Sequence, residues 1–79
     1  MSLDAYKNQI DQIDDKLLSL LERRKLVCGM INKIKQKKDI PLEDKEREEE
    51  ILCTLTKKSR KLSKDNLHDL YEVIFSISK

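Results

Sequence analysis

The chain has 79 residues, of which 17 are basic and 15 acidic, with one Gly, one Pro and no Trp. Its 41% charged and 38% hydrophobic residues are typical of long helices rather than sheets, and its length allows a single domain over residues 1–79. The net charge of +2 and the few aromatic residues argue against nucleic-acid binding through the basic runs at 33–38 and 57–61.

Cysteine and histidine usage argues against a disulfide framework and a metal centre. Cys28 and Cys53 are far apart and stand among apolar neighbours, so we expect two reduced, packed thiols. No metal-ligand spacing surrounds His68, the one histidine. Neither a signal peptide nor a membrane-spanning run is present, which predicts a soluble cytoplasmic protein without a membrane partner.

The first predicted element is a helix over about residues 4–38, capped by Ser2 or Asp4 and closed by basic residues. Gly29 weakens a helix by about 1 kcal/mol relative to Ala, but the apolar pattern continues past it, and we interpret it as a position of close packing. Two heptad rows follow the helix, and one member is charged: Leu3, Ile10, Leu17, Arg24 and Ile31, with Ile13, Leu20, Val27 and Ile34.

The length of this helix predicts self-association. About 35 residues give a rod of roughly 50 Å, whereas a compact monomer of this size has a radius of gyration of about 12 Å. The rest of the chain is too short to cover such a rod. We therefore expect an all-α fold of three helices per chain, with one very long first helix, in an intertwined homodimer.

Two shorter helices follow the break at Pro41, which cannot continue a helix. The second is predicted over about 44–58, with Asp44 as its N-cap and a solvated basic turn after it. The third is predicted over about 64–79, opened by Ser63 or by Lys64 and Asp65. Its apolar residues keep their helical spacing up to the end of the sequence. We therefore expect this helix to be truncated rather than to end there naturally.

Charged residues interrupt the apolar face of the first helix. Arg24 and Lys35 lie about 20° apart around the axis and roughly 16 Å apart along it, so their side chains could converge on a small anion. Lys7 lies roughly 25 Å from Arg24 along the axis. It cannot reach the same pocket in its own subunit, but in an antiparallel dimer it could reach the partner's.

The second helix repeats this anomaly. Arg47 begins its apolar face and Glu48 borders it, and a guanidinium pairs bidentately with a carboxylate. Each residue also has an ordinary explanation: an inward Arg can be ion-paired, Lys35 can complement a helix dipole, and Asp44 can be only a cap. The convergence of cations on apolar faces favours a bound dicarboxylate, because unpaired charges there are costly.

At these residues the sequence resembles the all-helical chorismate mutases, over essentially its whole length. That family forms intertwined dimers of three-helix subunits and converts chorismate to prephenate in phenylalanine and tyrosine biosynthesis. The motifs that carry the resemblance are Ile10-Asp11-x-Ile13-Asp14, Leu17-Leu18-x-Leu20-Leu21-x-x-Arg24, Ile31-x-x-Ile34-Lys35 and Pro41-x-x-Asp44-x-x-Arg47-Glu48.

The resemblance implies roles for four cations. Arg24 and Arg47 would bind the two substrate carboxylates, assisted by Lys7 from the partner subunit. Lys35 would contact a carboxylate and the ether oxygen of the C–O bond that breaks. The family commonly has Arg at the position of Lys7, so here a bidentate clamp becomes a point charge.

The resemblance also implies the walls of the site. Glu48 and the backbone near Asp44 would hold the ring hydroxyl, Ser78 would approach a carboxylate, and Ile31 and Phe75 would be apolar walls. The family has a Gln or Glu about one turn beyond the position of Ser78, and the given sequence ends before it. Loss of such a donor typically costs ~3 kcal/mol of barrier.

A Claisen-type rearrangement explains why no catalytic triad, metal or cofactor is expected. The reaction is unimolecular, so an enzyme can work by holding the reactive conformer and stabilising charge on the ether oxygen. Two alternatives remain at this stage. The chain could be an isochorismate-pyruvate lyase, which shares the fold, or a non-catalytic dimerisation or regulatory module of a larger shikimate-pathway protein.

Overall fold

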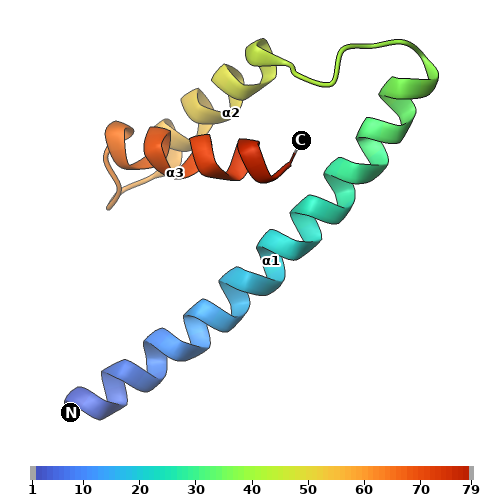
Figure 1. Ribbon diagram of the computed structural model, residues 1–79. Coiled ribbons are helices and arrows are strands. Elements are labelled where there is room, and N and C mark those ends of the chain that lie inside the picture. Colours follow the sequence, from blue (N-terminus) through green and yellow to red (C-terminus); the bar gives the residue numbers. More distant parts are fainter. Residues whose placement is uncertain (1, 79) are drawn as a thin grey trace.

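The computed structural model describes residues 2–78, which form three α-helices. They are α1 (Leu3–Lys37), α2 (Lys45–Lys58) and α3 (Lys64–Ile77) (Figure 1). The predicted all-α architecture with one very long first helix is confirmed. The predicted helix ends agree with these bounds to within one residue, and the predicted end of the third helix at position 79 lies outside the described residues.

The N-terminus of each helix is capped by a side chain. Ser2 Oγ accepts the Ala5 N–H at 3.2 Å, which settles the two candidate caps of α1 in favour of Ser2 and leaves Asp4 in the first turn. A capping box opens α3, in which Ser63 and Asn66 each accept the other's backbone N–H. Such caps are each worth about 1 kcal/mol.

A Schellman motif ends α1 at the position that the sequence predicts. Asp39 adopts a positive φ of 55°, its N–H bonds to Gln36 O, and the Ile40 N–H bonds to Lys35 O at 2.8 Å. These bonds satisfy carbonyls that have no partner within the helix. Pro41 then prevents any return to helix. The chain therefore turns at Asp39, one helical turn after Lys35, and leads into α2.

The small core lies between α2 and α3, which pack against each other. Leu67 and Ile74 of α3 are 5% and 8% exposed, and they are the buried residues of the described chain. Half-buried Leu52 and Leu55 of α2 and Tyr71 of α3 surround them. Burial of so few apolar side chains supplies only a few kcal/mol, which indicates that this chain needs further burial elsewhere.

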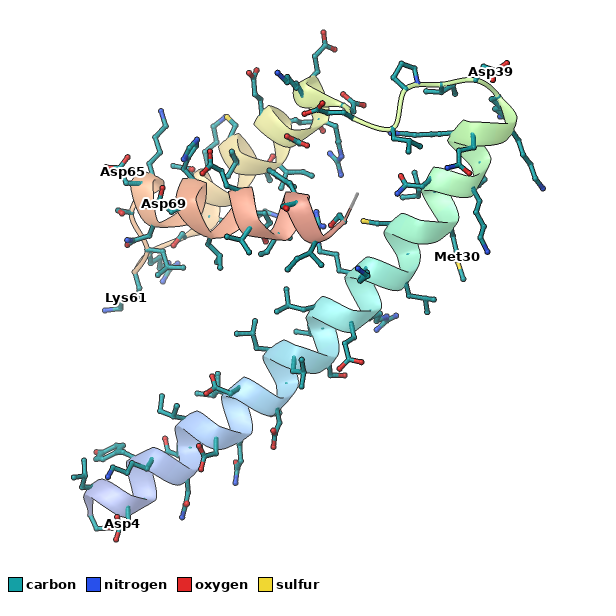
Figure 2. The ribbon with its side chains drawn as sticks, viewed as in Figure 1. Asp4, Met30, Asp39, Lys61, Asp65 and Asp69 are labelled. Atoms are coloured by element: carbon teal, nitrogen blue, oxygen red, sulfur yellow. The ribbon has the colours of Figure 1, made fainter. Side chains whose placement is uncertain are left out.

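Most of α1 lies outside this core. Its N-terminal half extends away from α2 and α3 (Figure 1), and its apolar side chains project freely (Figure 2), with Leu3 70% and Leu17 51% exposed. The molecule measures 55 × 24 × 16 Å with a radius of gyration of 15.9 Å, above the ~12 Å of a compact chain. The prediction that the chain cannot cover its first helix is confirmed, and the homodimer stays a prediction.

Two sequence expectations are wrong. A Cβ added at Gly29 would meet no atom within 4 Å, because this residue faces away from the apolar rows; it is therefore not a place of close packing in this chain. Cys53 is exposed rather than packed, whereas Cys28 is half-buried, and both thiols are free. Within residues 2–78, no helix combines the length and apolar composition needed to cross a bilayer.

The open space beside Gly29 gives a stability prediction. We expect Gly29→Ala to raise the free energy of unfolding by about 1 kcal/mol, because Ala gains helix propensity and meets no steric obstacle. Urea denaturation followed by circular dichroism measures the change. A loss of stability would instead show that another surface packs against Gly29 in the native assembly.

Candidate functional site

A cavity of about 180 Å³ lies where the C-terminal third of α1 faces the start of α2 and the end of α3. The turn after α1 brings the segment 42–44 to its rim. The residues that line the cavity come from all three helices and this segment: Cys28, Ile31, Asn32, Lys35, Leu42, Glu43, Asp44, Arg47, Glu48, Ile51, Phe75 and Ser78.

Seven of the nine site residues predicted from the sequence line this cavity: Ile31, Lys35, Asp44, Arg47, Glu48, Phe75 and Ser78. Sequence reasoning missed the participation of Cys28 and Asn32. Their spacing held a signal, because Cys28, Asn32 and Lys35 follow one another by four and three residues and so share a helix face. The predicted residues thus come together, and they do so within one chain.

Arg24 contacts residues that line the cavity, and its polar partners within residues 2–78 are uncharged. Its Nη1 donates to Ser78 Oγ at 2.5 Å and lies 3.8 Å from Cys28 Sγ. Its guanidinium carbon lies 5.7 Å from the centre of the Phe75 ring, an arrangement that favours a cation through the ring quadrupole. Arg24 therefore reaches the cavity through Ser78, which is one of the lining residues.

Two cations of this site have no ion-pair partner among the described residues. Arg24 and Lys35 are both half-buried, and among residues 2–78 neither forms an ion pair. The ordinary explanation of Arg24 as an ion-paired residue therefore does not hold within the described chain. Half-buried charges without a counter-charge are costly, so the site favours an anionic ligand.

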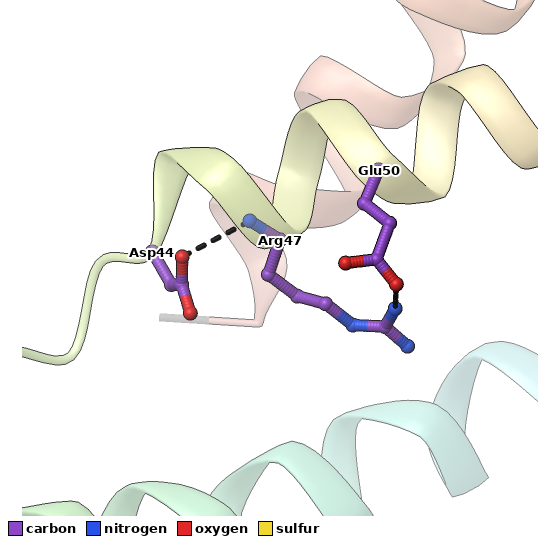
Figure 3. A network of polar contacts seen from close by, with 3 residues as sticks. All are labelled: Asp44, Arg47 and Glu50. Atoms are coloured by element: carbon purple, nitrogen blue, oxygen red, sulfur yellow. Dashed lines mark hydrogen bonds and ion pairs between the residues drawn. The ribbon is translucent and has the colours of Figure 1, made fainter.

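Arg47 differs, because its side chain is paired on the surface. The Asp44 carboxylate caps α2 by accepting the Arg47 N–H at 3.0 Å, and Arg47 Nη1 bonds to Glu50 Oε1 at 2.7 Å (Figure 3). The two side chains are 59% and 67% exposed. Sequence reasoning missed this partner. An exposed pair is worth only about 0–1 kcal/mol, so a ligand carboxylate can compete with Glu50 for the guanidinium.

Lys7, the remaining predicted site residue, lies far from the cavity of its own chain. It is exposed near the start of α1, and the helical rise places it roughly 42 Å from Lys35 along the axis. A role for Lys7 at this kind of site therefore requires a second subunit.

A second polar group on α3 was not anticipated. His68, Asp69 and Glu72 each bring one potential ligand atom within 4.8 Å of the others, since residues four apart share a helix face. The expectation that nothing near His68 has metal-ligand spacing therefore overlooked these neighbours. All three residues are exposed, and such groups are common as solvated ion pairs.

A family model described as chorismate mutase type II matches residues 6–79. The chain belongs to the type II chorismate mutase family. The match covers nearly the whole chain, including every segment that lines the cavity. Searches of the curated proteins and of the solved structures gave no match.

Family membership supports the resemblance on which the site was predicted. The substrate implied by a chorismate mutase domain, chorismate, carries one carboxylate on its ring and a second on the enolpyruvyl group that is attached through the ether oxygen. The site has apolar walls, two cations without an ion pair among residues 2–78, and a third cation in a surface pair that can exchange. This is the chemistry that such a dianion requires.

A substitution of Glu50 tests whether a substrate carboxylate can replace Glu50 as the partner of Arg47. We expect Glu50→Gln to lower KM for chorismate by up to about threefold with little change in kcat, because the variant frees Arg47 from a weak competitor. Steady-state kinetics measures both constants. Glu46→Gln, which changes the same charge on the same helix, is the matched control, and an equal KM in both variants would contradict the competition.

Proposed function

We propose that the chain is an enzyme that rearranges chorismate to prephenate in phenylalanine and tyrosine biosynthesis, as a single domain over residues 1–79. The observation that carries this proposal is a pair of half-buried cations, Arg24 and Lys35, which form no ion pair within residues 2–78. They lie at the cavity of a chain that belongs to the type II chorismate mutase family. No cofactor is required by the reaction that we propose.

Binding of the dianion would use three cations of one chain. Arg24 offers further N–H donors beside the one that Ser78 accepts, because a guanidinium has five. Arg47 would exchange Glu50 for one substrate carboxylate, and Arg24 would take the other. Neutral partners leave the charge of Arg24 uncompensated until substrate arrives, which supports its assignment to a carboxylate.

The chemistry follows from position and charge. One C–O bond breaks as one C–C bond forms within the same molecule, so no proton transfer or covalent intermediate is needed. Lys35 would donate to the ether oxygen as negative charge develops there, while the cavity walls hold the reactive diaxial conformer. A millionfold acceleration requires only ~8 kcal/mol, within the range of these two effects.

The hydroxyl group of the substrate ring would form a hydrogen bond at the start of α2. Glu48 is half-buried and lines the cavity, which suits a carboxylate that accepts a hydrogen bond. The Asp44 carboxylate already accepts the Arg47 N–H, so its contribution would come through the backbone beside it. Ile31 and Phe75 would supply the apolar walls.

Ser78 is assigned a role in orienting Arg24. Its hydroxyl donates to Ile74 O at 2.8 Å and accepts from Arg24 Nη1. The single hydroxyl proton is therefore already used. In this arrangement Ser78 approaches the substrate carboxylate by placing the guanidinium that binds it.

A homodimer is part of the proposal. The exposed apolar rows of α1 need a covering surface, and a second α1 in antiparallel orientation has a matching set of rows. That orientation would bring the partner subunit's Lys7 to the cavity, where a point charge could assist in binding a carboxylate. The exposed rows support this assembly because such an apolar surface is unusual on a monomer.

The experiment that tests the function is a turnover assay with chorismate and, separately, isochorismate, with products identified by chromatography. We expect prephenate from chorismate and no pyruvate from isochorismate. Pyruvate release would indicate the lyase alternative, and no turnover of either substrate would indicate a binding or regulatory module. Within the same assay Lys35→Ala should lower kcat/KM at least a hundredfold, whereas Lys37→Ala, on the same helix end, should stay within about twofold.

The dimer has its own prediction. We expect Leu17→Glu to shift the protein from dimer to monomer in analytical ultracentrifugation, because it places a charge in the apolar row. Ser19→Glu, on the opposite side of α1, should leave the dimer intact. An unchanged dimer in the Leu17 variant would show that α1 does not self-associate through this row.

A further inference from the structure

The last turn of α3 is attached to α1 by three side chains. Arg24 donates to Ser78 Oγ, Lys25 Nζ to Ile77 O at 3.3 Å, and Asn32 Nδ2 to Ser78 O at 3.2 Å. We propose that Asn32 is a positioning residue, which holds this turn on α1 and thereby sets where Ser78 and Phe75 stand in the cavity. The proposal rests on the proposed function for its catalytic consequence.

The end of α3 has a physical reason to bind α1. The last carbonyls of a helix have no partner within it, and the last turn of α3 contains no basic residue of its own. Side chains from α1 supply the missing donors. Lys25 also places a positive charge near the negative end of the helix dipole.

The three donor side chains, Arg24, Lys25 and Asn32, lie on one side of α1. Lys25 and Asn32 are seven residues apart, which places them about 20° apart around the axis and roughly 10 Å along it. Arg24 and Cys28 lie beside and between them. Figure 1 shows the C-terminal end of α3 directed at this part of α1.

Compared with the bond of Lys25, the hydrogen bond of Asn32 is better placed to influence the shape of the cavity. Lys25 is exposed and its bond is exposed to solvent, so water competes with it. Asn32 is half-buried, its bond is partly shielded, and it lines the cavity three residues before Lys35. Together with the bond from Arg24 to Ser78, this amide thus couples the wall made by α3 to the helix that carries Lys35.

Other packing does not replace this attachment. The close helix packing of the described chain is between α2 and α3, so side-chain bonds such as that of Asn32 have to hold the end of α3 on α1. Asn is also a poor helix former in a helix interior. Its position inside the C-terminal part of α1 therefore lacks a local explanation, and its bond to Ser78 O supplies a tertiary one.

Asn32→Ala tests the assignment, with Lys33→Ala as the matched control on the same helix. The first readout is amide hydrogen exchange of residues 74–78 in the full chain. We expect about threefold to tenfold faster exchange in the Asn32 variant only, the loss expected for one hydrogen bond. The second readout is kcat/KM for chorismate, which we expect to fall by about the same factor.

The two readouts separate positioning from stability. Ala is the better helix former, so an Asn32 with only a local structural role would give a variant of equal or greater thermal stability and unchanged kcat/KM. Unchanged exchange at 74–78, or faster exchange with unchanged kcat/KM in the active enzyme, overturns the proposal. If the unaltered chain does not turn over chorismate, the proposed function fails, and the exchange result alone decides whether Asn32 holds the turn.

Discussion

The constraint on which this structure depends is the mismatch between one helix and the chain that carries it. α1 has 35 residues, whereas α2 and α3 bury their apolar faces mainly against each other. The Schellman turn after Lys35 returns the chain to the C-terminal third of α1 only. That return creates the cavity, and it leaves the N-terminal apolar rows without a partner. Cavity and exposed rows are thus two consequences of one helix length.

Charge on the apolar side of α1 gives the cavity its chemistry. Arg24 is held by a hydroxyl and an aromatic ring, and Lys35 has no acidic partner within residues 2–78. Arg24 is thus positioned without being neutralised by a described residue, which is a condition for electrostatic preorganisation. Arg47 is different, since its surface pair with Glu50 can exchange at small cost. The site therefore combines a positioned charge, Arg24, with a charge that can change its partner, Arg47.

Sequence reasoning reached the helices and their caps because these depend on local patterns, whereas most of the cavity residues were implied by the family resemblance. Helical spacing predicts that Ile31 and Lys35 share a face, and Pro41 predicts the break. It missed the bond between Asn32 and Ser78, because a periodic pattern shows which way a side chain faces but not which distant segment meets it. The same limit explains Gly29, whose interpretation assumed a neighbour that the chain does not place there.

The measurement that tests this account most directly is complementation between two impaired variants, Lys7→Ala and Lys35→Ala. If the site takes Lys35 from one chain and the partner subunit's Lys7 from the other, a mixed dimer contains one intact site and one doubly impaired site. Unfolding and refolding an equal mixture should then restore about one quarter of the unmodified activity, since half of the randomly formed dimers are mixed. Activity no higher than the average of the two separate variants would contradict a shared site and, with it, the role assigned to α1.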